Sequence, residues 1–188
     1  MNILPKVLKV LLLIFAANTL ALGQTQPDKP ANTTQNGTAW KSLKDDQFEI
    51  KYPSDWTADE SGMMGTHFIL FSPLSGETDQ FKENVNLLVQ DLTGYDLTLD
   101  AYVELSENQI KTMITDGKIF LSERIKAENA AYHKVIYSGI QGEFDLKFEQ
   151  FYWVRNNTAY ILTLTCENDQ FEAYRETGES ILHSFKIK

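Results

Sequence analysis

The chain has 188 residues, enough for one domain with a short appendage. Its composition, 43% hydrophobic and 23% charged, is typical of globular proteins and excludes a wholly disordered, collagen-like or coiled-coil chain. The formal net charge of -9 has the wrong sign for a protein that binds phosphate backbones through clustered lysine and arginine, so we expect no nucleic acid partner. A single cysteine excludes an intramolecular disulfide framework.

The first 23 residues resemble an export signal. Lys6 and Lys9 precede an apolar run from Val10 to Phe15, which continues through alanines and leucines. The run is too short to span a bilayer as a stable helix, so residues 1–23 are predicted to be a cleaved signal peptide, with an uncleaved anchor as the alternative. We therefore expect an exported protein in the periplasm or outside the cell, without stable membrane insertion after cleavage. No cysteine lies near the expected cleavage site, so the protein is not expected to be a lipoprotein.

The composition changes twice after this segment. Residues 24–39 lack large apolar side chains and are rich in Thr, Asn, Gln and Pro. Such a segment cannot offset its ordering entropy by burial, so it is predicted to be a flexible polar tether. From residue 40 to 188 the pattern consists of short alternating segments, and we expect a single domain there.

The first half of this domain carries strand patterns followed by a helix. Residues 48–53 alternate between apolar and polar and end on a proline, which cannot donate to a ladder. Residues 68–71 and 85–89 are mostly apolar with little solvent-facing alternation, which favours central strands. Thr98 is a favoured N-cap for an amphipathic helix of about four turns, and Gly117 fits a stop beyond its end.

A long β-hairpin is the strongest local signal in the second half. Residues 144–154 and 160–166 each place apolar side chains on one face, and Asn156-Asn157 suits the positive φ angles of a type I′ turn. Asp169, with Glu172 three residues later, resembles a capping box that opens a second amphipathic helix. Runs of strands with two helices among them predict an α+β fold with a central antiparallel β-sheet flanked by helices.

Five residues form the candidate partner surface. One face of the hairpin carries Phe151, Trp153 and Arg155, and aromatic residues with arginine are typical of binding hot spots. The favoured interpretation is that a helix covers the aromatic end, and a binding surface is the alternative to it. Met63 and Met64 lie in a glycine-flanked loop, where they either contact a partner or tuck under the sheet.

The histidines and the cysteine form no recognisable site. His67, His133 and His183 fall on three different predicted elements without a paired spacing, so no metal site is predicted. Met63-Met64 with His67 offer soft ligands for monovalent copper, but too few of them. Cys166 shares a face with apolar residues, which favours a small buried hydrophobe over a reactive thiol.

Motifs for catalysis and for cofactors are also missing. The sequence has no GxSxG elbow, no phosphate-binding glycine loop, no GxGxxG, no calcium loop and no recognisable carboxylate pair. We therefore predict no catalytic residues and no cofactor. The acidic residues near predicted strand ends are interpreted as a solvated rim.

An ordered set of motifs resembles the PsbP-like superfamily. The set comprises F-x-I-x-Y-P-x-x-W at 48–56, F-x-x-N-V-N at 81–86, the helix opened by Thr98-Leu99, Y-I-L-T at 160–163 and I-L-x-S-F at 181–185. The resemblance covers residues 40–188 and implies a Mog/PsbP-like fold, exported in most bacterial members and not catalytic. Its named members bind proteins: PsbP is an extrinsic subunit of photosystem II, and the yeast Mog protein binds the GTPase Ran. The basic docking residues of PsbP find no match in this acidic chain, so the photosystem role is not carried over.

These observations lead to one expectation and two alternatives. The leading interpretation is an exported, non-enzymatic protein-interaction or accessory module of the cell envelope. The first alternative is a carrier that binds a small ligand or a metal ion. The second is a hydrolase whose geometry is not recognisable in the sequence.

Overall fold

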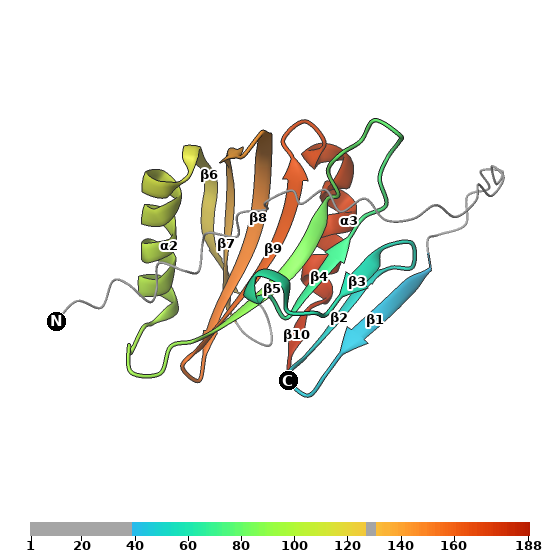
Figure 1. Ribbon diagram of the computed structural model, residues 1–188. Helices are drawn as coiled ribbons and strands as arrows, with labels where there is room; N and C mark the ends of the chain where they lie inside the picture. The colour runs from blue at the N-terminus through green and yellow to red at the C-terminus, as the bar shows by residue number, and fades with distance from the viewer. Residues whose placement is uncertain (1–38, 127–130) are drawn as a thin grey trace.

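The structure is a computed structural model that describes residues 39–126 and 131–188. Two antiparallel β-sheets and two α-helices make up this part of the chain (Figure 1). The predicted α+β class and antiparallel sheet are confirmed. The predicted signal peptide and nearly all of the predicted tether lie outside the described residues.

The larger sheet has seven strands in the order β3-β4-β5-β9-β8-β7-β6, and all neighbours are antiparallel. The strands are β3 (Thr57–Asp59), β4 (Phe68–Phe71), β5 (Asn84–Asp91), β6 (Thr115–Ile125), β7 (Tyr132–Gln141), β8 (Phe144–Arg155) and β9 (Thr158–Glu167). β4 and β5 lie inside the sheet, as the lack of clear alternation at 68–71 and 85–89 predicts.

The smaller sheet has three strands in the order β1-β2-β10, which are β1 (Trp40–Lys44), β2 (Phe48–Pro53) and β10 (Lys186–Ile187). Phe48, Ile50 and Tyr52 of β2 point into the core, so the predicted alternation of this strand is confirmed. The short β10 joins the C-terminal end of the chain to β2.

The two helices pack on different faces of the large sheet. Helix α2 (Leu99–Met113) packs on β6, β7 and β8, and helix α3 (Phe171–Ser184) packs on β9 and β5 and against β2. The predicted N-cap is confirmed, because the Ala101 backbone N–H donates to Thr98 Oγ1 at 3.2 Å. A short 3-10 turn, η1 (Met63–Gly65), lies between β3 and β4.

The sheet therefore separates two cores. On the α2 side, Tyr102 packs against Tyr152 with ring centroids 6.1 Å apart. On the α3 side, Leu164 and Cys166 pack under the helix, and a Cβ on Gly178 would lie only 2.4 Å from a methyl carbon of Leu164. Cys166 is buried, as its apolar face predicts, and burial raises the pKa of its thiol.

The predicted hairpin turn is confirmed, but two local predictions differ from the structure. Asn156 and Asn157 have φ angles of 51° and 55°, as a type I′ turn requires. Helix α3 begins after Gln170 without a side-chain cap, so Asp169 forms no capping box. Gly117 lies within β6 rather than ending α2: a Cβ there would lie 2.2 Å from the Ile110 carbonyl oxygen, so only glycine allows the close approach.

Trp56 tests the α3-side core. Its side chain is 5% exposed and meets Tyr174 with ring centroids 6.5 Å apart. We expect Trp56→Ala to lower the free energy of unfolding by about 3–5 kcal/mol, because truncation leaves a cavity. Urea unfolding measures the change. Trp40→Ala, at a side chain 44% exposed, is the control and should cost less than about 1 kcal/mol; an equally small loss for Trp56→Ala would contradict its place in the core.

Candidate functional site

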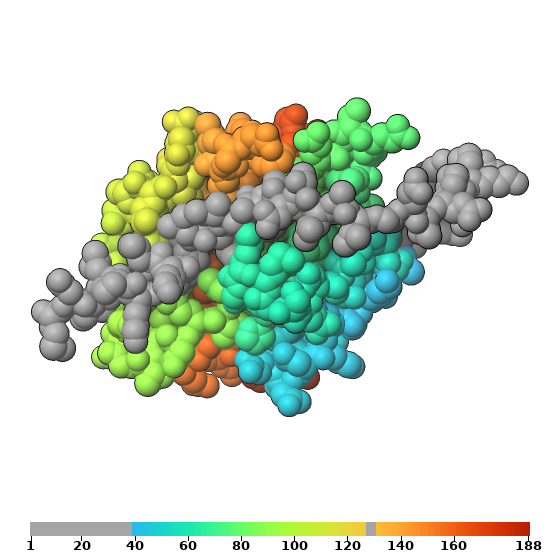
Figure 2. Space-filling view, in the orientation of Figure 1, coloured from blue at the N-terminus to red at the C-terminus, as the bar shows by residue number. Residues whose placement is uncertain are grey.

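Two exposed methionines project from the turn between β3 and β4. Met63 and Met64 are 45% and 38% exposed. Gly62, Met64 and Gly65 have φ angles of 78°, 55° and 80°, so three of four consecutive residues adopt the left-handed conformation. Figure 2 shows this region in teal at the surface of the face in view. We call Gly62–Gly65 the methionine turn.

Hydrogen bonds hold the methionine turn in place. The Gly65 N–H donates to the Gly62 carbonyl at 3.0 Å, and the backbone and hydroxyl of Thr66 both donate to the Met63 carbonyl, at 3.0 and 2.7 Å. The next residue, His67, donates its backbone N–H to the Leu87 carbonyl of β5 at 2.7 Å. A left-handed conformation costs a residue such as Met64 about 1 kcal/mol or more, so the anchoring contacts must maintain it.

The structure places the other candidate residues elsewhere. Phe151 and Trp153 are 1% and 9% exposed, and both rings pack on Tyr132 with centroids 4.5 and 5.4 Å away. His183 of α3 lies over Phe151, and Phe185 packs on Trp153. The favoured arrangement, a covered aromatic end, is therefore the one found. Phe151 and Trp153 are corrected as candidate partner residues, because both side chains belong to the core.

Arg155 is the third exposed member of the candidate surface. It ends β8 and pairs with Thr158, whose β5 partner is Asp91. The methionine turn is instead anchored at Leu87, four residues earlier on β5, or roughly 13 Å along the strand. The exposed candidates thus lie at two separate places along the sheet.

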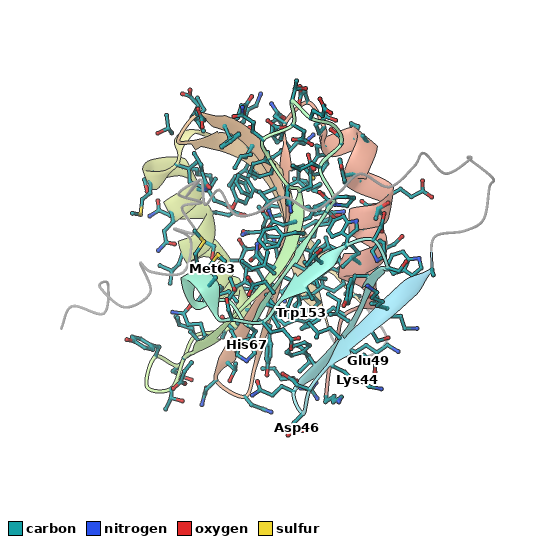
Figure 3. All side chains as sticks on the ribbon, turned by 45° about the vertical axis from the view of Figure 1, so that its right-hand side comes forward. Lys44, Asp46, Glu49, Met63, His67 and Trp153 are labelled. Carbon is teal, nitrogen blue, oxygen red and sulfur yellow. The ribbon has the colours of Figure 1, made fainter. Side chains whose placement is uncertain are left out.

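The histidines do not converge. His67 makes an edge contact with Phe48, with ring centroids 6.1 Å apart, beside the methionine turn (Figure 3). His183 lies on α3 and His133 on β7. Among residues 39–126 and 131–188, no group of three or more His, Cys, Asp or Glu side chains is arranged to hold a metal ion.

One polar cluster escaped the sequence analysis. Ser122 of β6 lies between two partners: its Oγ is 2.5 Å from Glu107 Oε1 on α2 and 2.7 Å from His133 Nε2 on β7. Burial, then the charge of Arg124, lowers the pKa of His133, and the hydrogen bond from Ser122 lowers the pKa of Glu107. The three residues come from three elements, and only the strand register brings them together.

This cluster differs from a catalytic triad in the place of its acid. A triad carboxylate bonds the histidine Nδ1 and leaves the serine oxygen free to attack. Here Glu107 bonds the serine, and within the described residues the buried His133 Nδ1 has no partner. The arrangement links α2 to β6 and β7 and does not prepare Ser122 as a nucleophile.

Two carboxyl groups are buried on the α3 side of the sheet. Glu149 is fully buried, and Lys134 Nζ lies 2.7 Å from its Oε1 and 3.3 Å from Glu179 Oε1 of α3. Burial raises the pKa of Glu149. Burial also acts to lower the pKa of Lys134, but the contacts with Glu149 and Glu179 outweigh it, so the pKa of Lys134 is raised. Glu83 accepts a hydrogen bond from Ser72 Oγ at 3.2 Å, and burial raises its pKa as well.

The raised pKa of Glu83 predicts a pH dependence of stability. Its proton is held more tightly in the folded state, so this group favours folding at acidic pH and the benefit is lost as the pH rises through the folded pKa. We expect Glu83→Gln, a neutral mimic of the acid, to raise the melting temperature at neutral pH and to have little effect below about pH 4. Thermal unfolding across this range measures the difference.

The exposed Glu77 supplies the control for Glu83→Gln. Glu77→Gln should change the melting temperature little at any pH, because that side chain is already solvated. A Glu83→Gln protein that is less stable than the wild type at neutral pH would show that ionised Glu83 makes a net favourable contribution.

Comparisons with known proteins identify the fold. No family model matches the chain, and no curated protein matches it. The solution structure of cyanobacterial PsbP from Synechocystis sp. PCC 6803 superposes with a TM-score of 0.61, at 13% identity, over 85% of this chain and 98% of that one. The chain has the PsbP-like fold. The resemblance inferred from its ordered motifs is confirmed at the level of fold.

Two further structures share this fold. LpqN of Mycobacterium tuberculosis, described as involved in cell envelope biogenesis, has a TM-score of 0.57 at 12% identity, covering 81% of this chain and 92% of its own. A Pseudomonas aeruginosa protein of unknown function, described as a putative regulator, has a TM-score of 0.56 at 15% identity, covering 77% and 94%. Within residues 39–126 and 131–188, no helix has the length and hydropathy to cross a membrane.

Proposed function

We propose that this chain is an exported, non-enzymatic accessory protein of the cell envelope that binds another protein through the methionine turn. The observation that carries this proposal is the display of two large apolar side chains, Met63 and Met64, on a backbone fixed by hydrogen bonds. Methionine is flexible and polarizable and adapts to irregular apolar surfaces.

The strain at Met64 supports a binding role. The left-handed conformation lowers stability, and burial compensates for it only in part, because Met63 and Met64 remain 45% and 38% exposed. Polar residues at positions 63 and 64 would allow the same turn and would expose less apolar surface to water. A contact with a partner gives a reason for apolar side chains at these positions.

Location in the envelope rests on two further points. The pattern of residues 1–23 is that of an export signal. Among proteins of the same fold, LpqN is described as acting in cell envelope biogenesis. A shared fold does not transfer a function by itself, so the test addresses the binding surface directly.

The test is crosslinking in the host cell with the full-length protein. A photoreactive residue in place of Met64 should form a crosslinked product with another protein, and Met63→Ser in the same chain should weaken it, because the partner loses its apolar contact. The matched control places the photoreactive residue at Met113, which is 41% exposed on α2. Blotting and mass spectrometry of envelope fractions identify the products.

Stability separates a loss of binding from a loss of folding. We expect Met63→Ser to shift the free energy of unfolding by less than about 0.5 kcal/mol, because the side chain is exposed. Equal products from positions 64 and 113, or none from either, would contradict the methionine turn as the contact. An Arg155→Ser variant that alone abolished crosslinking would move the contact to the end of β8.

A further inference from the structure

Polar side chains attach helix α2 to the outer strands of the large sheet. The helix lies along β6 (Figure 1). Ser122 of β6 has its Oγ 2.5 Å from Glu107 Oε1 of α2 and 2.7 Å from His133 Nε2 of β7. Arg124, two residues further along β6, contacts Asp100 in the first turn of α2. The attachment of α2 to β6 and β7 therefore includes a chain of hydrogen bonds that ends on a titratable ring.

The single hydroxyl proton of Ser122 determines the direction of both hydrogen bonds. The hydrogen bond from Ser122, helped by Lys111 at 3.3 Å, lowers the pKa of Glu107, so this carboxylate is ionised and only accepts. Ser122 therefore donates to Glu107, and the Nε2–H of His133 donates to Ser122 Oγ. The neutral ring of His133 is then the Nε2–H tautomer, and its Nδ1 carries no proton.

The Nδ1 atom of His133 takes the next proton, and its surroundings do not suit that proton. Nδ1 is buried and has no hydrogen-bond partner among residues 39–126 and 131–188. A buried N–H without an acceptor is costly. A turn of the ring that brought Nδ1 to water would withdraw Nε2 from Ser122 and break the chain of hydrogen bonds. Protonation of His133 therefore opposes the observed arrangement in either orientation of the ring.

Charged groups on α2 and β6 also act on the His133 ring. The titratable groups around it are Asp100 and Glu107 of α2, Glu123 and Arg124 of β6, and Tyr152, its register partner on β8. Arg124 repels an imidazolium, the three carboxylates attract it, and Tyr152 is uncharged because burial raises the pKa of its hydroxyl. Burial of the ring and the charge of Arg124 prevail, so the pKa of His133 lies below its usual value.

We propose that His133 is a pH-sensitive switch for helix α2: the neutral ring holds α2 on β6 and β7 through Ser122, and its protonation breaks this link so that α2 opens more often. Because the closed form binds the proton less tightly than the open form, the link stabilises the closed form above about pH 6.5 and is lost as the pH falls through the lowered pKa of His133. The switch lies on other elements than the methionine turn and does not depend on the function proposed for that turn.

Apolar packing limits how far the switch acts. Tyr102, Val103 and Ile110 of α2 are buried in the α2-side core, and protonation of His133 does not remove these contacts. We therefore expect acid to change how often α2 opens and not to unfold the protein. Each opening exposes apolar residues that α2 covers, among them Val135 and Tyr137 of β7.

NMR of the histidine rings tests the switch in the full-length wild-type protein. The ¹⁵N chemical shifts of an imidazole report which nitrogen carries the proton, and their pH titration reports the pKa of the ring. We expect neutral His133 to carry its proton on Nε2 and to titrate below pH 6.5. A neutral ring with its proton on Nδ1, or a pKa of 6.5 or higher, would overturn the proposal.

Hydrogen exchange measures the opening of α2 itself. Protection factors, corrected for the intrinsic pH dependence of exchange, are compared between about pH 7.5 and pH 5. We expect the protection of α2 amides to fall about threefold or more over this range, and that of α3 amides to change less. An equal loss in both helices would show that acid destabilises the whole fold and would exclude a switch specific to α2.

His133→Gln supplies the matched variant, because a glutamine amide N–H can donate to Ser122 as Nε2–H does but does not titrate. We expect its α2 protection to resemble the wild type at neutral pH and to lose the response to acid. His183→Gln, on α3, is the control and should keep the wild-type response. An acid response that persists in His133→Gln would assign it to another group and refute the switch. Thermal unfolding checks that both variants are folded.

Discussion

The fold depends on the fact that both faces of strands β8 and β9 are apolar. Alternate residues of β8 enter different cores: Phe148 and Tyr152 pack under α2, whereas Phe151 and Trp153 pack on the α3 side. A shift of one residue in the pairing of these strands would exchange every side chain between the two cores. The type I′ turn at Asn156-Asn157 sets the register, and each face then requires its own helix.

This requirement determines where surface remains available for binding. A seven-stranded sheet is wider than a single helix, and in the described part of the chain each face has one. Helix α2 buries the outer strands from one side, and α3 buries the inner strands from the other. The exposed apolar residues of β6 and β7 follow from this offset, whereas the exposed methionine turn lies outside the sheet, between β3 and β4.

The sequence predicts features that depend on neighbouring residues, but it does not predict features that depend on how distant strands and helices pack together. The Thr98 cap, the asparagine turn and the buried Cys166 each follow from a few neighbouring residues. The face of the sheet that α3 covers cannot be predicted in this way, because β8 carries apolar side chains on both faces and its periodicity does not distinguish them. The contact of Ser122 with His133 and Glu107 also depends on a register with shifts in β6, which no local pattern reveals.

The ion pair beneath α3 explains how that helix keeps its position. Apolar contacts alone allow a helix to slide on a sheet, since they have no direction. Glu149 is fully buried on β8, and Lys134 joins it to Glu179 of α3. If α3 shifted, Lys134 would lose its contact with Glu179. If the contact between Lys134 and Glu149 broke as well, a buried charge would be left without a partner, which is strongly destabilising. The same lysine therefore ties α3 to strands β7 and β8 of the sheet.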